Sequence, residues 1–144
     1  MSQKIVVGFD ESAGAQRALD FAVKMAKAQG AGIVVAHVLE WSPYSFLTPM
    51  EIEERHKRRG EELARAESAL LAPVVKKLES SGVTVTTALR YGHIAETLCD
   101  IAEKEGASQM VIGRTGHSSL PSRLFGSVAG GLAQSAPVPL TIVP

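Results

Sequence analysis

Residues 32–39, with the sequence GIVVAHVL, form a run that is apolar at almost every position. A strand with apolar residues on both of its faces is typical of a parallel sheet that helices cover on both sides. A similar run, KIVVGF at residues 4–9, precedes it, and a helical pattern from about Ala15 to Gln29 lies between the two. This strand–helix–strand order predicts two parallel strands joined by a right-handed crossover.

The same alternation continues to the end of the chain. Three further apolar or β-branched runs predict strands at Val83–Leu89, Gln109–Ile112 and Leu140–Val143. Ile94, Leu98 and Ile101 recur at helical spacing before Gly106, and Ser127–Ser135 is a short helical pattern of small residues. We therefore expect one α/β domain, residues 1–144, built on an open, doubly wound parallel sheet of five strands with helices on both faces.

A long charged helix is expected from about Met50 to Ser80, with Gly82 after its end. Its buried stripe should consist of the apolar residues Leu63, Ala66, Leu70, Val74 and Leu78. Pro73 should kink this helix, because proline removes a backbone donor and crowds the preceding turn.

Composition excludes several classes of protein. The chain has 15 basic and 15 acidic residues, and this balance does not indicate the excess positive charge that binds a nucleic acid or an anionic membrane. No stretch approaches the roughly 20 apolar residues of a membrane span, and Met1–Val7 does not resemble a signal peptide. The single cysteine, Cys99, allows no internal disulfide. We expect a cytoplasmic protein.

Ligands of open parallel sheets bind beyond the carboxyl ends of the strands, where the strand order reverses. Three segments of the chain should meet there: Gly8–Ser12, Val38 with the loop that follows it, and the stretch from Gly113 to Val128. In that stretch three glycines have the spacing G-x2-G-x9-G, and a serine that opens a helix follows the last one.

Gly126 and Ser127 open that helix, and a helix N-terminus presents free N–H groups and a partial positive charge to an anion. Arg114 and Arg123 lie in the same loop and could add positive charge. The pattern predicts a phosphate site. A second interpretation stays open, in which the glycines only form a flexible turn and Ser127 is an ordinary cap.

The chain resembles the universal stress protein family, in particular its ATP-binding branch. The resemblance extends over the whole chain and includes the segments Ile5–Ser12, His37-Val38, Val111–Gly116, Leu124–Val128 and Val138–Val143. It implies a strand order of 3-2-1-4-5 and a nucleotide across the tips of the first and fourth strands.

The resemblance also implies roles for single residues. Asp10 and the backbone of Val38 would meet the adenosine end, and Gly113 and Gly116 would line the ribose and phosphates. The phosphates, with Mg²⁺ or Mn²⁺ alongside, would be held at the helix start. The full set of expected binding residues is Gly8, Phe9, Asp10, Val38, Ile112, Gly113, Arg114, Gly116, His117, Arg123, Gly126, Ser127 and Val128.

The role of three of these residues is open to a second interpretation. Gly8 stands where some family members have proline, and Arg114 departs from the family's commoner serine, so its role is open. Asp10 could also cap the helix that follows it. His37, one of four scattered histidines without metal-ligand spacing, is expected to be a half-buried strand residue rather than a ligand.

Other nucleotide folds do not match, because no glycine precedes a lysine as in a P-loop and no G-x-G-x-x-G follows the first strand. We expect an ATP-binding sensor or regulatory module with an unknown protein partner that reads its nucleotide state. A slow ATPase or autophosphorylating enzyme is the alternative, and an interaction protein with an empty site is a third.

Two further expectations concern assembly. The last strand follows Pro139, which favours the edge of the sheet, and the family pairs two copies through this strand. The loop Glu40–Pro49 carries Trp41, Tyr44 and Phe46, and could cover the nucleotide, contact a partner or a higher oligomer, or pack on its own domain.

Overall fold

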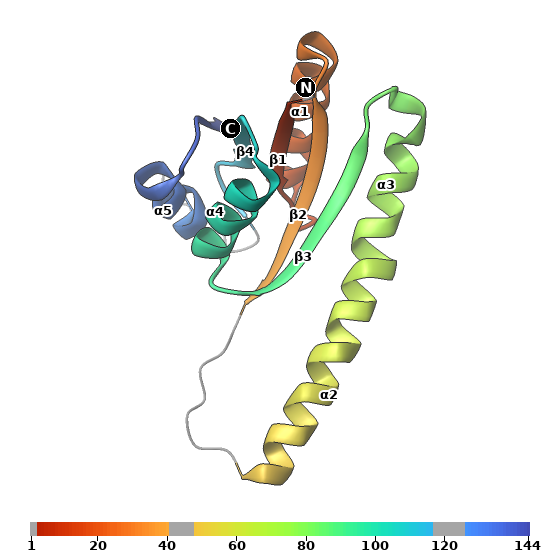
Figure 1. The fold of residues 1–144 in the computed structure, drawn as a ribbon, viewed down its shortest axis with the longest axis vertical. Coiled ribbons are helices and arrows are strands. Elements are labelled where there is room, and N and C mark those ends of the chain that lie inside the picture. The colour runs from red at the N-terminus through yellow and green to blue at the C-terminus, as the bar shows by residue number, and fades with distance from the viewer. Residues whose placement is uncertain (1–2, 41–47, 117–125) are drawn as a thin grey trace.

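The computed structural model describes residues 3–40, 48–116 and 126–144. These residues contain a parallel sheet of five strands in the order β3-β2-β1-β4-β5 (Figure 1). The strands are β1 (Lys4–Gly8), β2 (Gly32–Glu40), β3 (Val85–Gly92), β4 (Gln109–Gly113) and β5 (Leu140–Val143). All four pairings are parallel, so the predicted architecture and strand order are confirmed.

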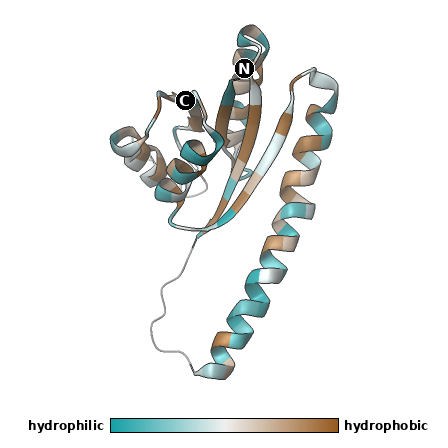
Figure 2. Cartoon of the chain, viewed as in Figure 1, coloured by the Kyte–Doolittle hydropathy of each residue, from teal (hydrophilic) through white to brown (hydrophobic). Residues whose placement is uncertain are grey.

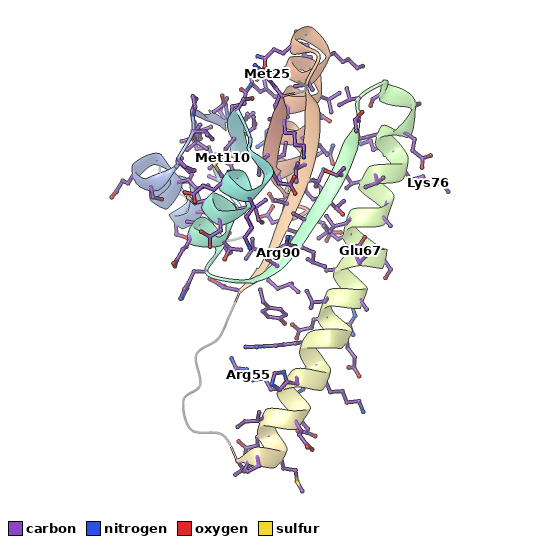
Figure 3. All side chains as sticks on the ribbon, viewed as in Figure 1. Met25, Arg55, Glu67, Lys76, Arg90 and Met110 are labelled. Atoms are coloured by element: carbon purple, nitrogen blue, oxygen red, sulfur yellow. The ribbon has the colours of Figure 1, made fainter. Side chains whose placement is uncertain are left out.

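Two layers of helices cover the two faces of the sheet. Helix α1 (Ala13–Gln29) and the later part of the long helix pack on one face, against Val7 and its neighbours. Helices α4 (Ile94–Glu105) and α5 (Ser127–Ser135) pack on the other, where Met110 of β4 lies in the core (Figure 3). Both faces of the central strands are therefore apolar, and this is why the runs at residues 4–9 and 32–39 do not alternate.

The long helix differs from the expectation at Pro73. It consists of α2 (Pro49–Arg65), a π segment (Ala66–Leu71), α3 (Ala72–Leu78) and a short 3-10 turn (Glu79–Ser81). Ala72 N–H donates to the carbonyl of Glu67, five residues back. This wider turn ends just before Pro73, and Figure 1 shows one continuous rod. The chain thus accommodates proline by a local change of helix type instead of a sharp kink.

The buried stripe of this helix includes Leu71, which the expected stripe lacks. Ala66, Val74 and Leu78 are buried as expected, and Leu63 and Leu70 are half-buried. Leu71 is fully buried as well, and it lies on the same helix face as Val74 and Leu78, which follow it by three and seven residues.

Helix α2 has no buried residue. It extends beyond the sheet (Figure 1) and is largely hydrophilic (Figure 2). Near its carboxyl end it meets Tyr91 of β3, whose hydroxyl donates to Glu62 and whose ring lies 5.1 Å from the Arg59 guanidinium. Burial and the hydrogen bond to Glu62 raise the pKa of Tyr91.

The helix ends follow the sequence signals more closely than the strand ends. Gly30, Gly82 and Gly106 all adopt the left-handed conformation directly after a helix, as expected. The third strand, however, begins at Val85 rather than Val83. Val83 N–H donates to Ser81 Oγ within the turn, so this residue belongs to the turn and not to the ladder. No helix among residues 3–40, 48–116 and 126–144 is long and apolar enough to cross a membrane.

Candidate functional site

A pocket lies at the carboxyl ends of β1, β2 and β4, where the strand order reverses. About 500 Å³ of space lies between the residues that line it, and this figure includes volume open to solvent. Its lining residues are Gly8, Phe9, Asp10, Ser12, Ala15, Ala36, His37, Val38, Ile94, Leu98, Ile112, Gly113, Thr115, Gly116 and Val128.

The β1–α1 turn forms one side of this pocket. Ser12 is the N-cap of α1, since its Oγ accepts from Ala15 N–H at 3.0 Å. Asp10 Oδ1 in turn accepts from Ser12 N–H at 3.0 Å and from Ser12 Oγ at 2.5 Å. Glu11, between them, has a φ of 67°, an uncommon conformation for a residue other than glycine. The cap therefore belongs to Ser12, and Asp10 supports it while lining the pocket.

The opposite side of the pocket is apolar. Val38, Leu98 and Ile112 are nearly inaccessible side chains from three different elements, and Ile94 adds the first turn of α4. A flat aromatic base can be stabilised on such a surface by burial of its apolar faces. The pocket therefore combines an apolar wall suited to a base with a turn that carries a carboxylate.

The three glycines of the G-x2-G-x9-G motif differ in how closely other backbone atoms approach them. A Cβ on Gly113 would stand 2.8 Å from the carbonyl carbon and oxygen of Gly14, and 3.2 Å from Ala15 N. Conversely, a Cβ on Gly14 would stand 2.5 Å from the carbonyl oxygen of Thr115. The start of α1 therefore packs backbone against backbone on the end of β4. Gly113 is required by this packing, whether or not a ligand is present.

A side chain at Gly116 or Gly126 would be less crowded by backbone atoms than one at Gly113. A Cβ on Gly116 would stand 2.9 Å from Asp10 Oδ2, the far end of a side chain, and on Gly126 nothing would lie nearer than 3.5 Å. Gly126 has an ordinary φ of −66°. A Cβ on Gly126 would make ordinary contacts with the backbone of residues 114–116, so the described fold does not require glycine at this position.

The N-terminus of α5 is not closed by a side chain. Gly126 is its N-cap and makes no side-chain cap hydrogen bond. Gly130 N–H donates to the Gly126 carbonyl at 3.0 Å, which is the first bond of the helix ladder. The N–H groups of Ser127, Val128 and Ala129 come before it and so have no partner within the helix. Val128 also lines the pocket, so these donors and the positive end of the helix dipole lie next to it.

The structure brings most of the expected residues together. Gly8, Phe9, Asp10, Val38, Ile112, Gly113, Gly116 and Val128 line the pocket, and Gly126 and Ser127 stand beside it at the start of α5. Arg114 does not line it: its N–H donates to Val143 of β5 at 2.8 Å, and its carbonyl accepts from Gly126 N–H at 2.9 Å. His117 and Arg123 lie outside the described residues.

Sequence reasoning missed part of the lining. Ser12 and Thr115 line the pocket and lie in segments that were expected there, although they were not in the expected binding set; the residues outside those segments are Ala15, Ala36, His37, Ile94 and Leu98. Ile94 and Leu98 had a usable signal, because they begin the apolar face of a helix whose N-terminus must lie at the ligand end of a parallel sheet. His37 is half-buried, as expected, and also borders the pocket.

A metal centre made by protein side chains does not occur in this part of the chain. Within the described ranges, no group of three or more His, Cys, Asp or Glu side chains could hold a metal ion. An ion bound here would need most of its ligands from a bound anion and water, as Mg²⁺ commonly does with phosphates.

Comparisons with known proteins agree on one family. A family model described as the universal stress protein family matches residues 1–144. Universal stress protein MJ0531 of Methanocaldococcus jannaschii is 32% identical over 146 residues, which cover 98% of this chain and 81% of the relative.

Solved structures show the same fold. Universal stress protein UspA of Lactobacillus plantarum has a TM-score of 0.83 at 25% identity, covering 99% of this chain and 97% of that chain. A universal stress protein family protein of Arabidopsis thaliana, solved with AMP bound, has a TM-score of 0.66 at 16% identity, covering 98% and 90%.

Proposed function

Because this chain belongs to the universal stress protein family, whose model matches its full length, we propose that it binds ATP and acts as a nucleotide-dependent regulatory module. The observation that carries the proposal is the pocket itself. An apolar wall, a carboxylate turn and an uncapped helix N-terminus surround one space at the switch point of the sheet.

Each part of that pocket suits one part of ATP. The apolar wall of Val38, Leu98 and Ile112 suits the adenine base, and the Asp10 carboxylate can accept from ribose hydroxyls. The first-turn N–H groups of α5 suit the phosphates, and Gly126 places no side chain beside these donors. AMP bound to the Arabidopsis protein of the same fold supports an adenine nucleotide.

The remaining parts of the proposal concern assembly and regulation. Mg²⁺ or Mn²⁺ would accompany ATP on its phosphate oxygens. Strand β5 lies at the edge of the sheet, and its residues are half-buried, which supports a homodimer formed through this strand. A protein partner would read the nucleotide state. Steady-state release of phosphate from ATP would instead identify the alternative, a slow ATPase.

Substitutions at Gly126 test the phosphate site. Aspartate and asparagine are both favourable N-caps, so either should keep or improve the stability of α5 while occupying the donors that ATP needs. Aspartate also brings a negative charge to the phosphates. We expect micromolar binding by the wild type, on the order of −8 kcal/mol, weaker binding by Gly126→Asn, and no measurable binding by Gly126→Asp.

Calorimetric titration with ATP, with and without Mg²⁺, gives the ranking, and circular dichroism confirms that each variant is folded. Gly130→Ala is the matched control, because a Cβ there has nothing within 4 Å and the residue lies one turn further along α5. If folded Gly126→Asp bound ATP as the wild type does, the phosphates would lie elsewhere.

A further inference from the structure

One hydrogen bond joins β2 to the turn that carries Asp10. His37 Nδ1 lies 2.7 Å from the carbonyl oxygen of Phe9. A carbonyl oxygen can only accept, so Nδ1 must carry the proton and donate. The bond therefore fixes the imidazole in the Nδ1–H form, or in the doubly protonated form, and excludes the neutral tautomer with its proton on Nε2.

Phe9 is held twice at this point. Besides the bond from His37, Phe9 N–H donates to the Ala36 carbonyl at 2.8 Å, so both polar groups of this residue are tied to β2. The ladder between β1 and β2 ends at Gly8 and Ala36. The His37 side chain thus extends the attachment of the chain to β2 by one residue beyond the regular strand pair.

The turn held in this way is strained. Glu11 has a φ of 67°, a conformation that non-glycine residues keep only where the surrounding contacts enforce it. After Glu11, Ser12 donates from both N–H and Oγ to Asp10, and before it Phe9 is tied to β2. These attachments on both sides of Glu11 keep the turn from relaxing and keep Asp10 in the pocket lining.

We propose that His37 is the positioning residue of this pocket: by donating from Nδ1 to the Phe9 carbonyl, it holds the β1–α1 turn in the shape that presents Asp10 to the ligand. The part that concerns a ligand rests on the proposed function. The part that concerns the turn does not, because it describes the protein without nucleotide.

Two measurements on the protein without nucleotide test the turn. Nitrogen-15 NMR of the imidazole should show a protonated Nδ1 for His37 at neutral pH, and a neutral Nε2–H tautomer would overturn the proposal. Amide exchange at Ser12, whose N–H donates to Asp10, should be about tenfold faster in His37→Leu, because the turn loses one hydrogen bond. Exchange at Val6, in the core of the sheet, should not change.

A rescue variant separates donation from packing. In His37→Asn the side-chain Nδ2 can stand near the place of Nδ1, so it should restore slow exchange at Ser12, whereas leucine should not. His56→Leu, on the exposed part of α2, controls for loss of an imidazole elsewhere. If asparagine failed to restore exchange while remaining folded, His37 would act through its volume, and the proposal would be wrong.

ATP titration then tests the pocket. We expect affinity to fall about tenfold in His37→Leu and to stay within about threefold of the wild type in His37→Asn and His56→Leu. Unchanged affinity in His37→Leu, beside a binding wild type, would refute the positioning role. If the wild type itself did not bind ATP, the proposed function would fail, and the exchange and NMR results would still decide whether His37 holds the turn.

Discussion

Replacing Gly113 by alanine should damage the fold, whereas the same replacement at Gly126 should not. Both glycines belong to one sequence motif, so the pattern alone assigns them one role. The structure separates them by what a new methyl group would meet. At Gly113 it would stand 2.8 Å from backbone atoms of Gly14, and at Gly126 its nearest neighbour would be the Arg114 carbonyl oxygen at 3.5 Å.

The size of the effect follows from these distances. To reach ordinary contact at 3.4 Å, the start of α1 and the end of β4 would have to separate by about 0.6 Å, the difference between 3.4 and 2.8 Å. Overpacking of this kind costs about 1–3 kcal/mol, and the upper half applies because backbone atoms cannot rotate away as a side chain can. For a chain of this length, that corresponds to a fall of roughly 5–10 °C in Tm.

At Gly126 two small effects oppose each other. Alanine is a poorer N-cap than glycine, which costs about 0.5–1 kcal/mol, but it lowers the entropy of the unfolded chain by a similar amount at an ordinary φ. The net change in stability should be under about 1 kcal/mol. Affinity for ATP should fall in Gly126→Ala, because the methyl group fills space that a phosphate would use.

Urea unfolding followed by circular dichroism measures both variants, with Gly130→Ala as a helix control that should gain about 0.8–1 kcal/mol. Gly113→Ala should unfold at a clearly lower urea concentration than the wild type. If it unfolded at the wild-type concentration, α1 and β4 would not be packed backbone on backbone, and the structural explanation of this glycine would be refuted.

Glu11→Gly should stabilise the protein by about 1 kcal/mol by relieving a left-handed residue, as measured by urea unfolding, and no gain would mean that the turn is not strained. Thr141→Lys, which places a charge on the β5 edge, should convert a dimer into monomers in light scattering; a dimer of unchanged mass would exclude pairing through β5. Burial and Glu62 raise the pKa of Tyr91 above its ordinary 10.0, so its contribution to stability is present below about pH 10 and is lost as pH rises through the raised value. Alkaline absorbance titration should therefore lose its later-ionising component in Tyr91→Phe, and an unchanged curve would contradict this.

The fold was predictable because its signals are local and repeated. The runs at residues 4–9 and 32–39 are too apolar for a sheet with one wet face, and glycines such as Gly30 and Gly106 end the helices between strands. Parallel pairing and short crossovers then restrict the topology. The strand order itself came from the family resemblance, since periodicity does not distinguish the possible orders.

The site was only partly predictable, for a physical reason. Residues that border the strand ends, such as Asp10 and Val38, are found by position in the chain. The contact between Gly14 and Gly113 joins segments about a hundred residues apart and leaves no pattern in either. The π segment before Pro73 was not predicted either, because proline disrupts a helix in several ways and the sequence does not say which one occurs.

Helix α2 has a consequence for engineering. The helix buries no residue, its contacts with Tyr91 come near its carboxyl end, and the exposed Glu54–Arg58 pair in its first half adds only about 0.2–0.5 kcal/mol. Its opening should therefore be a local event that leaves the sheet and pocket closed. A sequence inserted into its first turns would not take part in the cooperative unfolding of the sheet. The first turns of α2 are therefore a suitable place to attach a reporter peptide.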